Sequence, residues 1–336
     1  MIRKEDKIKI EDRILSLMEQ KNLAPWRCPW MFTDVNFGFG NKMPYRGVNA
    51  VITSLYRASM GFDSTMWFTD TKINNLNGLF YDKDKKKFVK DKQGKYDTFY
   101  HKRKGCRSIP IIKTLFLDKL DKNGKPILDE DGEKMTYPTA KLFNVYNGDD
   151  IVGYDSSLCE EQQNKEGTII DDLESINSAE LFQNDILARY KNHPSVSNDG
   201  GDRAYYIPSI DEVHVPRIKD FISWQEYAST LAHELSHSTG HKSRLDRNLE
   251  GNFGTSSYSK EELVAEFSAA MVLSKYGVKD IPIENSANYI KNWSDHIRAN
   301  KGILYEAIQQ AQKASDMILG IKINEENKWE EILFTT

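Results

Sequence analysis

A His-Glu-x-x-His motif constrains this chain more than any other feature of its sequence. His233 and His237 are four residues apart, and Glu234 lies between them. Residues four apart share one face of a helix, so both imidazoles can bind a single metal ion. The surrounding segment is typical of a helix, because it opens with a capping box at Ser223 and stops at Gly240. The motif therefore predicts that both His residues bind Zn²⁺ and that Glu234 acts as the catalytic general base.

A hydrolytic zinc site needs a third protein ligand, and three residues could supply it. His241 follows His237 by four residues, but the predicted helix ends before it, and the metzincin spacing would require a His at position 243, where Ser243 stands. Glu262 and Glu266 lie four apart on one face of the predicted helix SKEELVAEFSAAMVLSKYG. We assign Glu262 as the ligand and Glu266 as the residue that orients a ligand His, and we retain Glu266 as the alternative ligand.

Two further residue groups around this motif have a plainer interpretation. Ser259 to Glu262 also has the pattern of a capping box, so Glu262 could serve only to cap its helix. The residues after the motif are typical of an ion-paired surface loop. His241 and Arg244 could instead face the cleft and contact a substrate, because loop residues beside a site often carry function.

Charge divides the chain into two parts. Residues 1–160 have 28 Lys and Arg against 22 Asp and Glu, whereas the rest of the chain has 18 against 28. A polar, acidic stretch without hydrophobic periodicity follows the basic part and is typical of a linker. We therefore predict a first domain over residues 1–155, a linker over 156–175 and a second domain over 176–325.

The predicted fold class is α+β. In the N-terminal domain, apolar residues at helical spacing predict helices over 6–21 and 48–61, and β-branched runs between turn signals predict short antiparallel strands from about 65 to 154. The C-terminal domain is predicted to be mainly helical with a small sheet. One or two strands are expected in 204–216, and three or four helices follow Ser223.

Basic and aromatic residues are interleaved in the N-terminal domain. From Lys83 to Arg107 there are eleven Lys and Arg against three Asp, with aromatic residues among them. Aromatic side chains that stack on bases within a basic groove are what single-stranded DNA binding requires, although charge runs are more often solvated surface. The candidate DNA contacts are Trp26, Arg27, Trp30, Tyr45, Arg46, Asn49, Lys102, Arg103 and Lys104.

Other features bear on the location of the protein. No apolar run approaches 18 residues, so no membrane span is predicted, and the charged N-terminus lacks the apolar region of a secretory signal. The three cysteines, Cys28, Cys106 and Cys159, are widely spaced and give no Cys-based zinc site. We therefore expect a cytoplasmic protein.

Motifs along nearly the whole chain resemble the ArdC-type antirestriction proteins, which also occur as modules of phage polyvalent proteins. The N-terminal part of the resemblance consists of PWRCPW, PYRGVNAVITSL, MWFTDTKINNLNG, KGCRSIPII and KLFNVYNGDDIVG. The C-terminal part consists of AYYIPSIDEVHVP, HELSHSTGHKSRLDR and EELVAEFSAAM. The resemblance implies an N-terminal single-stranded DNA-binding domain, a C-terminal zincin-like metallopeptidase domain, and a role in protecting incoming mobile DNA from host restriction.

The chain departs from the family pattern at two places. Residues 82–97 form a longer Lys-rich insert, and Ser238 stands where the family commonly has an aromatic residue.

The sequence and the resemblance together are compatible with three functions. The first is an antirestriction protein of a mobile element or phage that binds single-stranded DNA, with a host restriction or defence protein as a candidate partner. The second is an intracellular zinc metallopeptidase whose N-terminal domain selects a protein target. The third is a zinc-stabilised scaffold without turnover.

Overall fold

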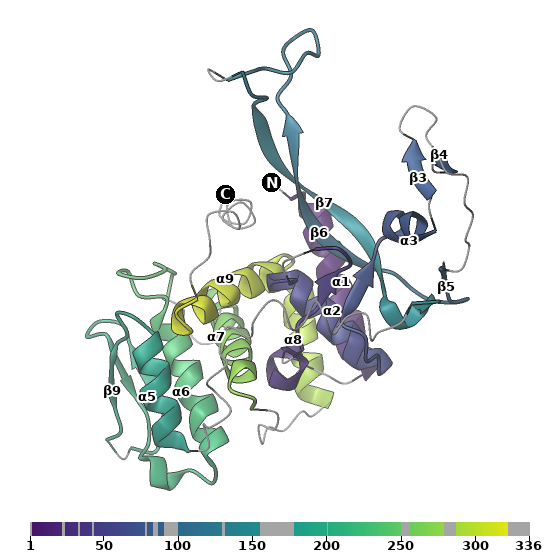
Figure 1. Cartoon of the computed structure of the whole chain (residues 1–336). Helices are drawn as coiled ribbons and strands as arrows, with labels where there is room; N and C mark the ends of the chain where they lie inside the picture. Colours follow the sequence, from purple (N-terminus) through teal and green to yellow (C-terminus); the bar gives the residue numbers. More distant parts are fainter. Residues whose placement is uncertain are drawn as a thin grey trace.

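The structure is a computed structural model of the chain (Figure 1), and its mixture of helices and sheets confirms the predicted α+β class. The residues that it describes are 2–21, 24–32, 34–41, 44–77, 79–82, 87–90, 100–129, 132–154, 178–199, 201–249, 256–278 and 287–321. The predicted linker, 156–175, lies outside these ranges. None of the helices within them combines the length and the apolar character that a bilayer crossing requires.

A four-stranded sheet organises the N-terminal half. Its strands, in spatial order, are β1 (Phe37–Gly38), β2 (Met66–Phe68), β7 (Thr136–Asn147) and β6 (Ile109–Asp118). β1 and β2 are parallel, and the other neighbours are antiparallel. The outer part of the β6–β7 ribbon projects from the body of the molecule (Figure 1). Two smaller pairs complete the strands of this half: β3 (Leu79–Asp82) with β4 (Lys87–Lys90), and β5 (His101–Lys102) with β8 (Ile151–Val152).

The N-terminal helices follow the predicted positions with one exception. α1 spans Lys4–Lys21, and α2 spans Gly47–Met60 and ends at Gly61, whose φ of 68° only glycine adopts easily. The exception is α3 (Asp70–Leu76), which occupies a region predicted as strand. The strand ends at Phe68, and the Thr69 hydroxyl then caps the helix by accepting a hydrogen bond from the Lys72 N–H at 3.2 Å. Short 3-10 turns occur at η1 (Pro25–Arg27), η2 (Pro29–Phe32) and η3 (Gly148–Asp150).

The C-terminal half is mainly helical and contains a three-stranded sheet, as predicted. The sheet order is β10 (Tyr205–Ile207), β11 (Glu212–His214) and β9 (Ser195–Ser197). The helical elements are α5 (Ala179–Arg189), η6 (Ile218–Asp220), α6 (Trp224–Ser238), α7 (Ser256–Lys275), α8 (Ala287–Ala299) and α9 (Ile303–Ile318). β9 was not predicted, and it pairs in parallel with β11. β10 is left at the edge of this sheet.

Helix α7 belongs to two hydrophobic cores. Leu263 and Phe267 pack into a core that includes residues of α1, α2 and α9, whereas Val272 and Leu273 pack into a core with α5 and α6. All four side chains are at most 1% exposed. α7 is therefore held on several sides.

Candidate metal centre

Helix α6 carries the three motif residues and is fixed in place by local and tertiary contacts. It begins after Ser223, whose hydroxyl accepts a hydrogen bond from the Glu226 N–H at 3.2 Å, and this confirms the predicted cap. Tyr227, Leu231 and Leu235 form the predicted apolar face and are fully buried. Burial of this face sets the rotation of the helix, so the motif side chains are directed toward α7 and the edge strand β10.

Three side-chain donors meet between α6 and α7. The Nε2 atoms of His233 and His237 are 3.1 Å apart, and each lies 3.6 Å from a carboxylate oxygen of Glu262. Tetrahedral zinc with bonds of about 2.0–2.1 Å has neighbouring ligand atoms about 3.3–3.4 Å apart, so the observed spacing fits one such ion. Within the described ranges, no other group of three His, Cys, Asp or Glu residues brings its donor atoms within 4.8 Å of one another.

The position of Glu262 in its helix decides whether this residue could serve as a helix cap rather than as a metal ligand. α7 begins at Ser256, so Ser259 is already inside the helix and is not its N-cap. The interpretation of Glu262 as a capping residue is therefore wrong. Glu266 lies one turn further along α7 and is not part of the three-donor group.

The charges around His233 form a strongly negative environment. Burial by itself lowers the pKa of His233, but the hydrogen bond with Glu262 and the negative charges of Glu266, Glu234 and Glu262 outweigh it and raise the pKa to about 9. Several carboxylates around two imidazoles attract a cation. Glu266 thus acts on His233 through its charge. The outer nitrogen of His237 contacts another carboxylate.

This carboxylate belongs to Glu261, which sequence reasoning missed. Its Oε1 lies 3.3 Å from Nδ1 of His237. Arg247 donates hydrogen bonds to both Glu261 oxygens, at 2.9 and 2.6 Å, and also to the Ser236 carbonyl and the Thr239 hydroxyl. Burial alone would raise the pKa of Glu261, but Arg247 and His237 outweigh it and lower the pKa. The ionised carboxylate accepts a hydrogen bond from the Nδ1–H of His237, and this leaves Nε2 directed at Glu262.

Glu234 lies in the wall of an open cleft beside the donors. Its side chain faces β10, where the Tyr206 N–H donates a hydrogen bond to the carboxylate. Burial raises the pKa of Glu234, although the positive charges of His233 and His237 oppose the shift. The cleft has a volume of about 410 Å³, and Tyr205 and Tyr206 form the wall opposite α6.

The loop after α6 has a structural role. The Arg244 side chain is only 3% exposed, forms an ion pair with Asp211, and donates to the carbonyls of Asn192 and Ser238, each at 2.8 Å. The interpretation of Arg244 as a substrate contact is therefore wrong, because its guanidinium is already bound within the fold. His241 Nδ1 lies 2.7 Å from the Ser243 hydroxyl, and His241 does not line the cleft.

Two of the predicted DNA contacts are structural residues. Trp26 is 1% exposed and packs edge-on against Phe267 and Trp293, with ring centroids 5.1 and 5.9 Å apart. The prediction that Trp26 stacks on a base is wrong, because its ring is inside the core. The Asn49 amide donates to the Ile112 carbonyl at 2.7 Å and accepts from the Ile112 N–H at 2.8 Å, so it joins α2 to β6.

Two more predicted contacts are engaged in the fold. Arg46 forms an ion pair with Asp316 of α9. Tyr45 is partly buried against the first core, and burial raises its pKa. The side chains of Arg27 and Trp30 lie outside the described part of the structure.

The last three predicted contacts lie at an exposed end of the N-terminal half. Lys102 forms an ion pair with Asp70 at 2.7 Å, and its ammonium lies 4.4 Å from the centre of the Tyr146 ring. Arg103 and Lys104 follow in the same segment and are exposed. The side chains of Arg103 and Lys104 are thus accessible to a partner, whereas the ammonium of Lys102 is already paired.

Two known families match separate parts of the chain. Residues 5–146 match the family described as the N-terminal domain of anti-restriction factor ArdC. Residues 187–310 match the family described as zincin-like metallopeptidase. The donor group and Glu234 all fall within the second range.

Several curated proteins are similar to the chain. Two DNA primases TraC from Escherichia coli are 28% and 26% identical to it over 314 and 315 residues. Each alignment covers 89% of this chain but only 19% and 26% of the primases, so the chain spans about a quarter of their length or less. The uncharacterized protein y4eC of Sinorhizobium fredii is 27% identical over 322 residues, which are 92% of this chain and 89% of that protein.

Two solved structures of the antirestriction protein ArdC from plasmid R388 have a similar fold. The metal-free structure superposes with a TM-score of 0.62 at 28% identity and covers 93% of this chain and 96% of its own. The Mn(II)-bound structure gives a TM-score of 0.62 at 27% identity, with 94% and 98% covered. The similarity thus extends over both halves of the chain.

Proposed function

We propose that this chain, which belongs to the ArdC-type antirestriction proteins, binds single-stranded DNA with its N-terminal half and hydrolyses peptide bonds at a metal centre in its C-terminal half. The main support is the meeting of His233, His237 and Glu262 beside Glu234 at an open cleft. The match of the C-terminal half to zincin-like metallopeptidases supports the same activity.

His233, His237 and Glu262 are the residues that would hold the metal, with Glu261 keeping the outer nitrogen of His237 in place. We propose zinc, because two imidazoles and one carboxylate are a usual ligand set of hydrolytic zinc sites. The R388 protein has been solved with Mn(II), which accepts similar ligands, so the metal is part of the test. When bound, such an ion polarises a carbonyl oxygen and lowers the pKa of a water molecule.

Glu234 would move the proton of the reaction. Its carboxylate would accept a proton from the attacking water and then deliver it to the nitrogen of the leaving amine. Burial of Glu234 raises its pKa toward neutrality, which suits a group that must both take and release a proton. The edge strand β10 borders the same cleft, so an extended peptide could lie along it.

Replacement of Glu234 by Gln tests the peptidase activity. Zinc-loaded wild-type protein should cleave fluorescently labelled casein, and Glu234→Gln should retain the metal while the rate falls by about 10²–10⁴-fold. Glu226→Gln on the same helix is the matched control, because Gln also completes a capping box.

The alternative is a scaffold role without catalysis, which predicts no cleavage by either protein. It also predicts that protection against restriction survives Glu234→Gln. A scaffold role is favoured by the way Arg247 and Glu261 tie His237 to the end of α6.

The projecting β6–β7 ribbon supports the proposed DNA binding. Lys113 and Lys141 are directly opposite each other in its register, and both are exposed. Like charges at a cross-strand pair are unfavourable unless an anion lies nearby, and no carboxylate within the described ranges forms an ion pair with either ammonium. Tyr137, 45% exposed, lies on the same face of the ribbon and could stack on a base.

A salt titration of single-stranded DNA binding tests this surface. Binding of a short oligonucleotide should weaken as salt increases. The double variant Lys113→Ala/Lys141→Ala should reduce the slope of log K against log salt by about 1.4, or about 0.7 for each lost phosphate contact. Lys134→Ala, two residues before β7, is the control, because Lys134 is paired with Asp118 of β6 at 3.0 Å. An unchanged slope in the double variant would exclude the ribbon as the DNA surface.

The two activities together define the proposed biological role. A protein that binds single-stranded DNA of an incoming mobile element could counter host restriction of that DNA. A restriction or other defence protein is then the candidate partner at the metal centre, and the cytoplasm is the proposed location. An intracellular peptidase whose N-terminal half selects a protein target is the alternative. It predicts cleavage of that target without any effect of single-stranded DNA.

A further inference from the structure

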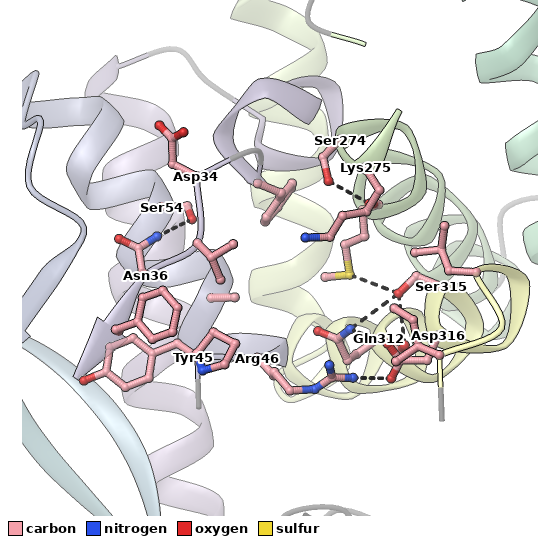
Figure 2. A pocket seen from close by; sticks show the side chains of 18 residues that line it. Asp34, Asn36, Tyr45, Arg46, Ser54, Ser274, Lys275, Gln312, Ser315 and Asp316 are labelled. Atoms are coloured by element: carbon pink, nitrogen blue, oxygen red, sulfur yellow. Dashed lines mark hydrogen bonds and ion pairs between the residues drawn. The ribbon is translucent and has the colours of Figure 1, made fainter. Parts of the chain in front are cut away.

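A second cavity, of about 430 Å³, lies at the other end of helix α7 (Figure 2). One wall comes from the N-terminal half, including Phe37 and Tyr45, and the other comes from α7 and α9, including Met271 and Leu319. Its size is in the range of small-molecule sites. Thirteen residues of α7 separate this end from Glu262, which corresponds to about 20 Å along the helix. The cavity is therefore distinct from the metal centre.

One cation points into this cavity without a partner in the described part of the chain. Figure 2 shows the Lys275 side chain reaching from α7 toward the wall that carries Asn36 and Tyr45. No hydrogen bond or ion pair joins its ammonium to any described residue. Burial lowers the pKa of Lys275, the positive charge of Arg46 lowers it further, and Asp316 opposes the shift. Lys275 is partly buried, and desolvating an ammonium without a partner costs free energy that no described contact of the fold offsets.

The neighbouring polar side chains are already satisfied. Arg46 is paired with Asp316, and the Gln312 amide donates to Asp316 at 3.1 Å and accepts from the Gly47 N–H at 2.8 Å. The Ser274 hydroxyl donates to the Met271 carbonyl at 2.7 Å. Asp34 is paired with Arg57, and Arg46 is paired with Asp316, so Lys275 is the one charged side chain of the described lining without an ion-pair partner.

We propose that this cavity binds a small monocarboxylate with an apolar body, whose carboxylate pairs with Lys275 and whose body lies against Phe37, Met271 and Leu319. A carboxylate matches a single cation. A phosphate carries about −1.5 to −2 charges at neutral pH and needs more donors than this mainly apolar cavity offers. Since the walls come from opposite halves of the chain, a bound carboxylate would also bridge them.

Calorimetric titration of the full chain with octanoate tests the proposal. Wild-type protein should show one saturable site, and Lys275→Met should weaken the binding at least tenfold. 1-Octanol, which has the same apolar body without the charge, should bind at least tenfold more weakly than octanoate. Lys260→Met is the matched control on the same helix, because Lys260 is exposed and paired with Glu306 at 2.7 Å, and it should bind octanoate as the wild type does.

The Tm of Lys275→Met tests whether a loss of octanoate binding comes from the missing ammonium or from a destabilised fold. Without octanoate its Tm should equal or exceed that of the wild type, because the substitution removes a partly buried, unpaired charge. The proposal is overturned if Lys275→Met binds octanoate with wild-type affinity, if the wild type shows no saturable site, or if octyl phosphate binds more tightly than octanoate. Octanoate binding should persist in a Glu262→Gln variant, so this proposal can fail or hold independently of the metal centre.

Discussion

Replacing Arg247 with Met should destabilise the protein and weaken its metal binding together. The Arg247 side chain is 7% exposed and that of Glu261 is 12% exposed, so this ion pair is largely buried. Removing one partner of a buried pair leaves an uncompensated charge, which costs about 3–5 kcal/mol of unfolding free energy. Because Glu261 also orients His237, loss of its anchor should weaken metal affinity by about 10–100-fold.

Urea unfolding of the metal-free protein and a metal titration measure the two effects separately. The double variant Arg247→Met/Glu261→Gln should recover much of the lost stability, because it no longer buries a lone carboxylate, while its metal affinity stays low. Lys260→Met removes the exposed pair with Glu306 on the same helix and should change stability by less than about 1 kcal/mol. The single variant Glu261→Gln completes the comparison. The reasoning is refuted if Arg247→Met costs less than about 1 kcal/mol of unfolding free energy, or if the losses of Arg247→Met and Glu261→Gln simply add in the double variant.

Three further outcomes follow from the described contacts. Trp26→Ala should lower the unfolding free energy by about 3–5 kcal/mol through loss of core packing, whereas a base-stacking role would instead lower DNA affinity in a stable protein. Asn49→Ala should cost about 1–3 kcal/mol, because it leaves the Ile112 N–H and carbonyl without partners, and its affinity for single-stranded DNA should equal that of the wild type. Zinc added to the EDTA-treated protein at about 100 times Kd should stabilise the fold by about 2.7 kcal/mol, seen as a rise in Tm, and the same Tm with and without metal would argue against a folded-state site.

Local sequence patterns were sufficient to predict helix α6, which carries the His-Glu-x-x-His motif. Ser223, the apolar face and the spacing of the two His residues all act within α6, so its start, its buried side and the shared face of the imidazoles follow from short-range rules. The sequence alone could not decide whether Glu262 or Glu266 is the third metal ligand, because both lie on one face of α7. How α7 packs against α6 decides which carboxylate reaches both Nε2 atoms.

The errors arose where tertiary contacts determine the role of a residue. Glu261 turns toward His237 because Arg247, fourteen residues earlier, holds its carboxylate, and no spacing rule within EELVAE indicates this. Trp26 was assigned to DNA because composition does not distinguish an aromatic residue in the core from one on the surface. α3 was missed because Thr69 was read as part of a strand, although its hydroxyl caps the following helix.

Metal content of matched variants tests the central claim most directly. The metal-free wild type, Glu262→Ala and Glu266→Ala would each be incubated with one equivalent of zinc and, in parallel, of Mn(II), then desalted and measured for metal per chain. The account predicts about one zinc per chain for the wild type and for Glu266→Ala, and near-complete loss for Glu262→Ala with its fold retained. Retention of the metal by Glu262→Ala together with its loss from Glu266→Ala would contradict the account.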